Sequence, residues 1–350
     1  MLCSPQELSM GGKVFVGSLA RITDLESKPF DTERIARSDW EPGDYVLGEI
    51  TLARGGFSEV ELCSGRLARP VDGDLMLGAL GVRRATLEVV GSFEGVGDDG
   101  VMDLLSASGL MGRATSVSGL FPPLIKVDYR GHAMRDGKKL NMRDFAKRRA
   151  TRTHYDIPTI LIVGTSMSAG KTTSAKIIIR ELTSLGYRVV GAKLTGSGRY
   201  RDILAMSDSD AYAVFDFVDV GLPSSVVPPY EYRECLADLL GLIAGAKPDV
   251  VVAEAGASPL EPYNGATALS ELGGAVVFTV LCASDPYAVV GVMNGFDIKP
   301  DLVGGLATST VAGEELVEKL CRAKALNLLD PRSIPQLRHM LRRALAARRT

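Results

Sequence analysis

The pattern of hydrophobic and polar positions changes near residue 157. Over residues 13–140, short β-branched or alternating runs such as 45–52 and 124–129 are separated by Gly, Asp and Pro. Strands bounded by tight turns produce this pattern. We therefore predict an all-β domain, a barrel or a sandwich, over residues 1–130, with one short helix over 101–108.

From residue 159 onward the pattern alternates between strands and helices. Nearly continuous apolar runs, typical of strands covered on both faces, are followed by helical segments. The alternation predicts an α/β fold class, with a doubly wound parallel sheet. The expected strands cover 159–163, 188–192, 249–253, 275–281 and 302–308, and the expected helices cover 171–185, 232–244, 286–295 and 313–321, with a terminal helix from about 331.

A basic segment separates the two patterns. Residues 131–156 are rich in Lys and Arg, mostly at 138–139 and 147–149. We interpret this segment as an inter-domain linker whose charges face solvent. The chain of 350 residues is long enough for two domains, and the second is expected over 157–350.

Charge and cysteine content narrow the class of protein. The 40 Lys and Arg nearly balance 42 Asp and Glu, so no overall positive field attracts nucleic acid or an acidic membrane. The apolar runs are shorter than the ~18 residues that a membrane span needs. Five scattered cysteines are typical of reduced thiols. We expect a cytoplasmic protein without a nucleic-acid or membrane partner and, because most oligomers are cyclic pairs, a homodimer.

The most informative segment is a loop of small residues between the first strand and first helix of the second domain. Small residues let backbone N–H groups converge on phosphate oxygens, and the positive end of the helix adds to the attraction. Lys171 would reach the β and γ phosphates, and the Thr172 hydroxyl would hold Mg²⁺. One residue more than the strict Walker A template separates the glycines, so the loop is a variant. The predicted nucleotide-binding residues are Gly164, Thr165, Ser166, Met167, Ser168, Ala169, Gly170, Lys171, Thr172 and Thr173.

Three charged residues are candidates for the same site. Glu254 ends a buried apolar run, where a carboxylate needs a cation or hydrogen bonds, so we predict a Mg²⁺ ligand, with an ion pair or a helix cap as the alternative. Asp210 precedes an apolar segment and suits either Mg²⁺ binding or helix capping. Lys193 lies near the end of the next strand, where a cation could hold a substrate carboxylate or the transferring phosphoryl group. Lys171 and Lys193 are therefore the candidate catalytic residues.

Further residues are candidates for substrate binding, together with Lys193. The segment 195–201 is expected to be a flexible cationic loop, in which Arg199 and Arg201 could contact an anion. A solvated turn is the alternative. Ser258 and Tyr263 could shape the substrate pocket, although packing explains them almost as well.

Several of these segments resemble known proteins over about residues 157–325. The loop 164–172 resembles the one-residue-longer P-loop of dethiobiotin synthetase and its relatives in the signal-recognition, MinD and BioD class of P-loop NTPases. The segment 190–193 is similar to the strand that carries their substrate-contacting lysine. The segments 209–211 and 251–257 look like the elements whose aspartate and glutamate bind Mg²⁺. The stretch 254–267 is closer to a bacterial family that includes D-glutamate N-acetyltransferases.

The leading hypothesis is an ATP- and Mg²⁺-dependent phosphoryl-transfer enzyme, similar to a kinase or ligase, that acts on a small anionic metabolite. A second is an acyl-CoA-dependent N-acyltransferase whose loop binds the phosphates of coenzyme A. A third is a nucleotide-switched NTPase for assembly or cofactor delivery. The sequence leaves the base of the nucleotide open between ATP and GTP.

Overall fold

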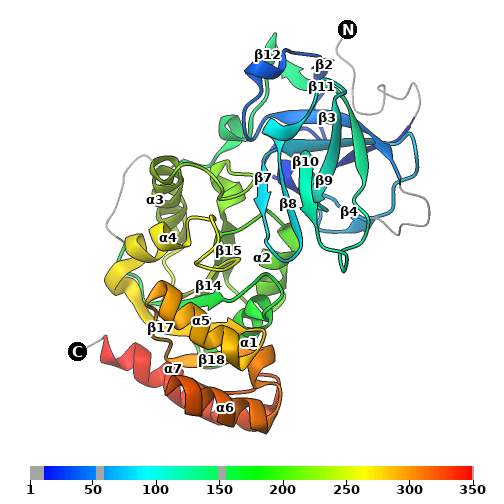
Figure 1. Ribbon diagram of the computed structural model, residues 1–350. Helices are drawn as coiled ribbons and strands as arrows, with labels where there is room; N and C mark the ends of the chain where they lie inside the picture. Colours follow the sequence, from blue (N-terminus) through cyan, green and yellow to red (C-terminus); the bar gives the residue numbers. More distant parts are fainter. Residues whose placement is uncertain (1–11, 53–58, 149–154, 349–350) are drawn as a thin grey trace. The chain divides into compact units, whose positions relative to one another are not determined.

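The computed structural model describes residues 12–52, 59–148 and 155–348 (Figure 1). The chain forms two compact units, each built from separate stretches of sequence. The β-rich unit contains residues up to 147 together with 197–201 and 217–226, and the α/β unit contains 148–196, 202–216 and 227–350. Two short stretches from the second half of the sequence therefore belong to the β-rich unit.

Five strands of the β-rich unit close into a ring. Strand β3 pairs with β6 and β11, β9 pairs with β10 and β11, and β10 pairs back with β6, so the predicted all-β region is a barrel. Fully buried side chains such as Val46, Met102 and Val127 form its core. The strands are β1 (Val14–Val16), β2 (Asp31–Glu33), β3 (Tyr45–Thr51), β4 (Val60–Glu61), β5 (Leu67–Ala68), β6 (Leu75–Leu80), β7 (Val82–Arg84), β8 (Val89–Ser92), β9 (Val101–Ser106), β10 (Leu110–Val117), β11 (Lys126–Arg135) and β12 (Lys138–Lys139), and the 3-10 helices are η1 (Ser18–Ala20), η2 (Arg37–Asp39), η3 (Phe93–Gly95), η4 (Met142–Phe145) and η5 (Phe217–Val220).

Two predictions for this region are wrong. The expected helix over 101–108 is strand β9, because pairing with β10 and β11 supplies hydrogen bonds along both of its edges. The expected linker over 131–156 does not begin at 131. Strand β11 continues to Arg135, and β12 and η4 follow it within the β-rich unit. Residues 149–154 of that expected linker lie outside the described residues.

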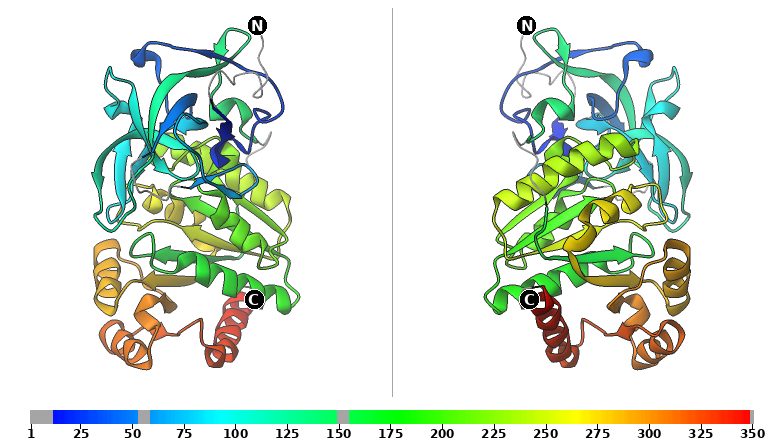
Figure 2. Two further views of the ribbon diagram at one scale, coloured as in Figure 1. Left: turned by 90° about the vertical axis from the view of Figure 1, so that its right-hand side faces the viewer. Right: turned by 90° about the vertical axis from the view of Figure 1, so that its left-hand side faces the viewer.

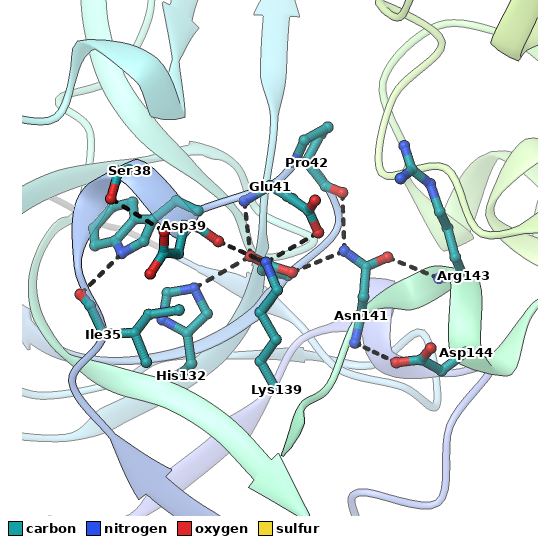
Figure 3. A network of polar contacts seen from close by, with 12 residues as sticks. Ile35, Ser38, Asp39, Glu41, Pro42, His132, Lys139, Asn141, Arg143 and Asp144 are labelled. Atoms are coloured by element: carbon teal, nitrogen blue, oxygen red, sulfur yellow. Dashed lines mark hydrogen bonds and ion pairs between the residues drawn. The ribbon is translucent and has the colours of Figure 1, made fainter. Parts of the chain in front are cut away.

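The buried carboxylate of Asp44 explains why part of the basic segment folds into the β-rich unit. Asp44 accepts hydrogen bonds from Lys139 Nζ (2.9 Å), Asn141 Nδ2 (2.9 Å) and the Glu41 backbone N–H (2.8 Å), and its Oδ2 lies 3.4 Å from His132 Nε2 (Figure 3). Burial raises the pKa of Asp44, but these donors outweigh it and hold the pKa below its usual value. The side chain of Lys139 therefore has a structural role in the β-rich unit.

The α/β unit contains the predicted doubly wound parallel sheet. All seven strands are parallel, in the order β15-β14-β16-β13-β17-β18-β19, so their carboxyl ends share one edge. In such sheets ligands bind at that edge. The strands are β13 (Thr159–Gly164), β14 (Val189–Thr195), β15 (Ala213–Asp216), β16 (Val250–Ala255), β17 (Val276–Ala283), β18 (Leu302–Gly305) and β19 (Lys324–Ala325).

Helices cover the sheet, and α1 and α7 pack on the same face. Their apolar side chains join alternate residues of the central strands, such as Ile160 and Ile162, in one core, and Figure 2 shows α7 (red) beside α1 (green). The intervening Leu161 and Val163 are equally buried, so both faces are covered. The helices are α1 (Lys171–Ser184), α2 (Tyr200–Ser207), α3 (Pro229–Gly245), α4 (Gly265–Leu272), α5 (Pro286–Phe296), α6 (Val311–Cys321) and α7 (Ile334–Ala347), with 3-10 helices η6 (Gly273–Ala275), η7 (Leu306–Thr308) and η8 (Pro331–Ser333). Within the described ranges, no helix has the length and apolar character that crossing a membrane requires.

Candidate functional site

The loop of small residues lies at the carboxyl edge of the sheet. It leaves the central strand β13 after Gly164 and enters α1 at Lys171, with Gly170 at φ +99° as the N-cap. The Thr165 N–H donates to the Cys282 carbonyl at 3.0 Å, which fixes the start of the loop to the end of β17. The loop thus joins a buried strand to the positive end of a helix, as phosphate binding requires.

Lys171 lies inside this loop. It is 3% exposed, and its Nζ donates to the carbonyls of Ser166 (2.6 Å) and Met167 (3.4 Å). A Cβ at position 164 would lie 2.8–2.9 Å from Cγ, Cδ and Nζ of Lys171, so only glycine lets the lysine fold back over the strand end. Burial lowers the pKa of Lys171, although the Glu254 carboxylate opposes this shift.

The end of β18 supports the loop from behind, a contact that sequence reasoning missed. Gly305 has φ +83°, and a Cβ there would lie 2.2 Å from the Ala169 carbonyl oxygen. A Cβ at Gly170 would in turn lie 3.1 Å from the Gly305 Cα. The only sequence signal was the Gly-Gly pair that ends this strand. The structure of the loop therefore depends on glycine at positions 170 and 305. These positions are far apart in sequence, but their backbones are in contact.

Glu254 reaches the loop from the neighbouring strand β16. The Thr172 Oγ1 donates to Glu254 Oε2 at 3.1 Å, and Glu254 is 3% exposed. Burial raises the pKa of this carboxyl, and the charges of Lys193 and Lys171 partly offset the shift. A hydroxyl and a carboxylate side by side next to a phosphate-binding loop are the oxygen donors that Mg²⁺ prefers. Two of the three predicted metal ligands are therefore adjacent.

Lys193 lies among carboxylates at the same edge. It is 5% exposed, stands in register with Asp216 of β15 and Glu254 of β16, and forms an ion pair with Asp202 of α2. Burial alone would lower the pKa of Lys193, but these three carboxylates together raise it. Lys193 is therefore held as an ammonium ion at the ligand-binding edge of the sheet.

Sequence reasoning missed Asp202 and Asp216. A signal for Asp216 was present, because this residue ends a short run of apolar residues as Glu254 does. Asp202 carried no such signal, since residues 195–201 were expected to be a flexible loop and α2 begins at Tyr200 instead. Both carboxylates come from elements that the apolar pattern did not predict.

The structure contradicts the predicted metal role of Asp210. Its carbonyl accepts from Thr183 Oγ1 at 3.2 Å, and nearby the Tyr212 N–H donates to Val189 at the start of β14. Thr183 is near the end of α1, ~18 Å along the helix from Lys171 at 1.5 Å per residue. Helix α2 carries the chain from the carboxyl edge back to the amino edge, so Asp210 lies at the edge away from Thr172 and Glu254.

The remaining candidates fall into two groups. In the α/β unit, Ser258 is 5% exposed, with its N–H donating to Glu261 Oε2 at 3.0 Å, and Tyr263 is fully buried. Arg199 and Arg201 belong to the β-rich unit, where Arg199 Nε lies 3.9 Å from Glu61 Oε2 and the Arg201 N–H donates to the same oxygen at 3.3 Å. That any of these four residues contacts a substrate stays a prediction.

The parallel sheet, the glycine-bounded loop after its central strand and the buried Lys171 define the α/β unit as a P-loop NTPase fold. No protein family matches the chain, and no curated protein matches it.

Among solved structures, the similarities that were found cover about half of this chain. For the hydrogenase maturation factor HypB from Archaeoglobus fulgidus, the identity is 15% over 55% of this chain and 91% of that chain, with a TM-score of 0.36. For HypB from Helicobacter pylori in complex with nickel, the identity is 14% over 55% of this chain and 89% of that chain, with a TM-score of 0.37. For FtsY from Mycoplasma mycoides, the identity is 12% over 51% of this chain, with a TM-score of 0.34. This match covers 62% of that chain, which is less than two thirds of it.

Proposed function

We propose that this protein binds a nucleoside triphosphate with Mg²⁺ and transfers its γ-phosphoryl group to a small anionic metabolite. The observation that carries the proposal is the grouping of Lys171, Glu254 and Lys193 at one strand edge. A Cβ at Gly256 would lie 3.5 Å from both Lys171 Cε and Glu254 Oε1, and one at Gly196 would lie 3.3 Å from Lys193 Cε. A second buried lysine beside the loop supplies a cation for an acceptor or for the transferring group.

The residues present fit such a ligand. The loop backbone and the start of α1 would hold the phosphates, and Thr172 with Glu254 would hold Mg²⁺, which neutralises phosphoryl oxygens when bound. Lys171 and Lys193 would stabilise the negative charge of the transferring group and orient it. Catalysis of this kind needs positioning and charge, and it needs no nucleophile from the protein. The resemblance of the loop to dethiobiotin synthetase supports ATP as the nucleotide.

Calorimetric titration with ATP and with GTP, each with and without Mg²⁺, tests the binding part of the proposal. We expect Mg²⁺-dependent binding of ATP that Lys171→Ala removes while its thermal unfolding stays close to that of the wild type. A screen of small carboxylates and amines for ADP release then tests transfer. Wild-type turnover in Lys171→Ala would contradict the assignment.

Other outcomes would favour the two alternative hypotheses. Binding of acetyl-CoA without Mg²⁺, together with no binding of ATP or GTP, would favour the acyltransferase. Slow hydrolysis that accelerates only when a protein partner is added would favour the nucleotide switch.

A further inference from the structure

We infer that Asp202 is a positioning residue of this site, which holds the ammonium group of Lys193 toward the phosphate loop. The inference rests on the proposed function, because it assigns Lys193 to the γ-phosphate of the bound nucleotide. Neither the P-loop pattern nor the resemblance to other proteins pointed to Asp202.

The contacts of Lys193 support this role. Its Nζ pairs with Asp202 Oδ2, and the Asp202 side chain is 25% exposed where that of Lys193 is 7% exposed. Asp202 stands in the first turn of α2, where a carboxylate also suits the positive end of the helix. The partner of the buried lysine is therefore itself fixed at a helix start.

The rest of the surroundings explain why one more carboxylate matters. Asp216 and Glu254 flank Lys193 on the two neighbouring strands and would draw the ammonium sideways, along the strand ends. Asp202 comes from α2, outside the sheet, and its Oδ2 accepts a hydrogen bond directly from the Lys193 ammonium. An ammonium has three N–H bonds, so a lysine oriented by one carboxylate can still donate to a ligand oxygen.

The test compares the affinities for ATP and ADP, both with Mg²⁺, because their ratio isolates binding of the γ-phosphate. The variants are Lys193→Ala, Asp202→Asn, both together, and Asp202→Glu as the conservative change. Asp208→Asn is the matched control, since Asp208 is an exposed aspartate in the residue after α2 and its change alters the net charge equally. Thermal unfolding of every variant reports on the fold.

We expect Lys193→Ala and Asp202→Asn each to lower the ATP-to-ADP affinity ratio on the order of tenfold, the effect of one charge-assisted hydrogen bond. Asp202→Asn should add nothing in the Lys193→Ala background, Asp202→Glu should restore most of the ratio, and Asp208→Asn should leave it unchanged. A merely structural role would weaken ATP and ADP binding alike.

Two results would overturn the inference alone. In the first, Lys193→Ala lowers the ratio and Asp202→Asn does not. In the second, Asp202→Asn lowers it equally with and without Lys193. An unchanged ratio in Lys193→Ala would also overturn the inference, because Lys193 would then not hold the γ-phosphate. Absence of nucleotide binding in the wild type would instead overturn the proposed function, and the inference with it.

Discussion

A glycine behind the phosphate loop allows a quantitative test of how the site is built. In Gly305→Ala, the new Cβ would lie 2.2 Å from the Ala169 carbonyl oxygen, whereas real contacts of this kind are essentially never shorter than 3.0 Å. The loop or the strand end must therefore move by about 0.8 Å, the difference between these distances. A set of phosphate-binding N–H groups does not tolerate such a shift.

The size of the effect follows from hydrogen-bond geometry. An N–H···O distance that grows from ~2.9 to ~3.7 Å is no longer a hydrogen bond. A hydrogen bond to a charged group contributes ~1.5–3 kcal/mol, so losing one should lower nucleotide affinity roughly 10- to 100-fold. The backbone of Gly305, at φ +83° and ψ −154°, lies in a region that essentially only glycine adopts, so another residue there adds about 1–3 kcal/mol of strain, which lowers the free energy of unfolding.

Gly186→Ala separates the two effects. Gly186 follows α1 with φ +86°, so alanine is strained there as well, but nothing lies within 4 Å of its Cβ position. Both variants should therefore unfold at lower temperature, and only Gly305→Ala should lose affinity for ATP with Mg²⁺ in calorimetric titration. Equal ATP affinity in the two variants would refute the argument that Gly305 supports the loop.

Three further predictions concern the metal, the core and the response to acid. Thr172→Ala should abolish the Mg²⁺ dependence of nucleotide binding and Thr172→Ser should keep it; Mg²⁺ dependence in the alanine variant, measured against an EDTA control, would contradict the assigned ligand. Leu341→Ala should lower the free energy of unfolding by about 2–5 kcal/mol because it leaves a cavity under α7, whereas Leu329→Ala, at a side chain that is 72% exposed, should change it by less than about 0.5 kcal/mol in urea titration. Since the pKa of Asp44 is lowered in the folded state, its ionised form stabilises the protein above about pH 4, and this contribution is lost as the pH falls below that value; Asp44→Asn should therefore flatten the loss of thermal stability between about pH 5 and pH 2, and an unchanged acid profile would refute this role.

The α/β unit was predictable because its pattern is local. Continuous apolar runs marked β13, β14, β16 and β17, and the loop that ends at Lys171 lay between a strand and a helix as predicted. Glu254 became a candidate by the same logic, since a carboxylate at the end of a buried strand needs a partner, and its contact with Thr172 places it beside the loop, while its metal role stays a prediction. The pairing of this residue with Thr172 follows from the parallel sheet.

The rest depended on partners distant in sequence. Residues 101–106 carry apolar side chains at spacings that suit a helix or a strand, and only pairing with β10 and β11 makes them β9. The predicted position of Asp210 was wrong because α2 carries the chain to the amino edge of the sheet. No strong apolar pattern predicts this helix. Gly305 could not be identified, since its role is a backbone contact with Ala169 across 136 residues of sequence.

The discontinuity of the β-rich unit limits how the chain can be divided. A fragment that ends at residue 147 would lack 197–201 and 217–226, which belong to the same unit. Such a fragment would lose the Gly198 carbonyl, which accepts a hydrogen bond from Ser108 Oγ. It would also lose the Asp219 carboxylate, which forms an ion pair with Lys147. Truncation or domain exchange at residue 147 therefore removes parts of the β-rich unit, and both units stay complete only when residues 148–226 remain joined to the residues before them.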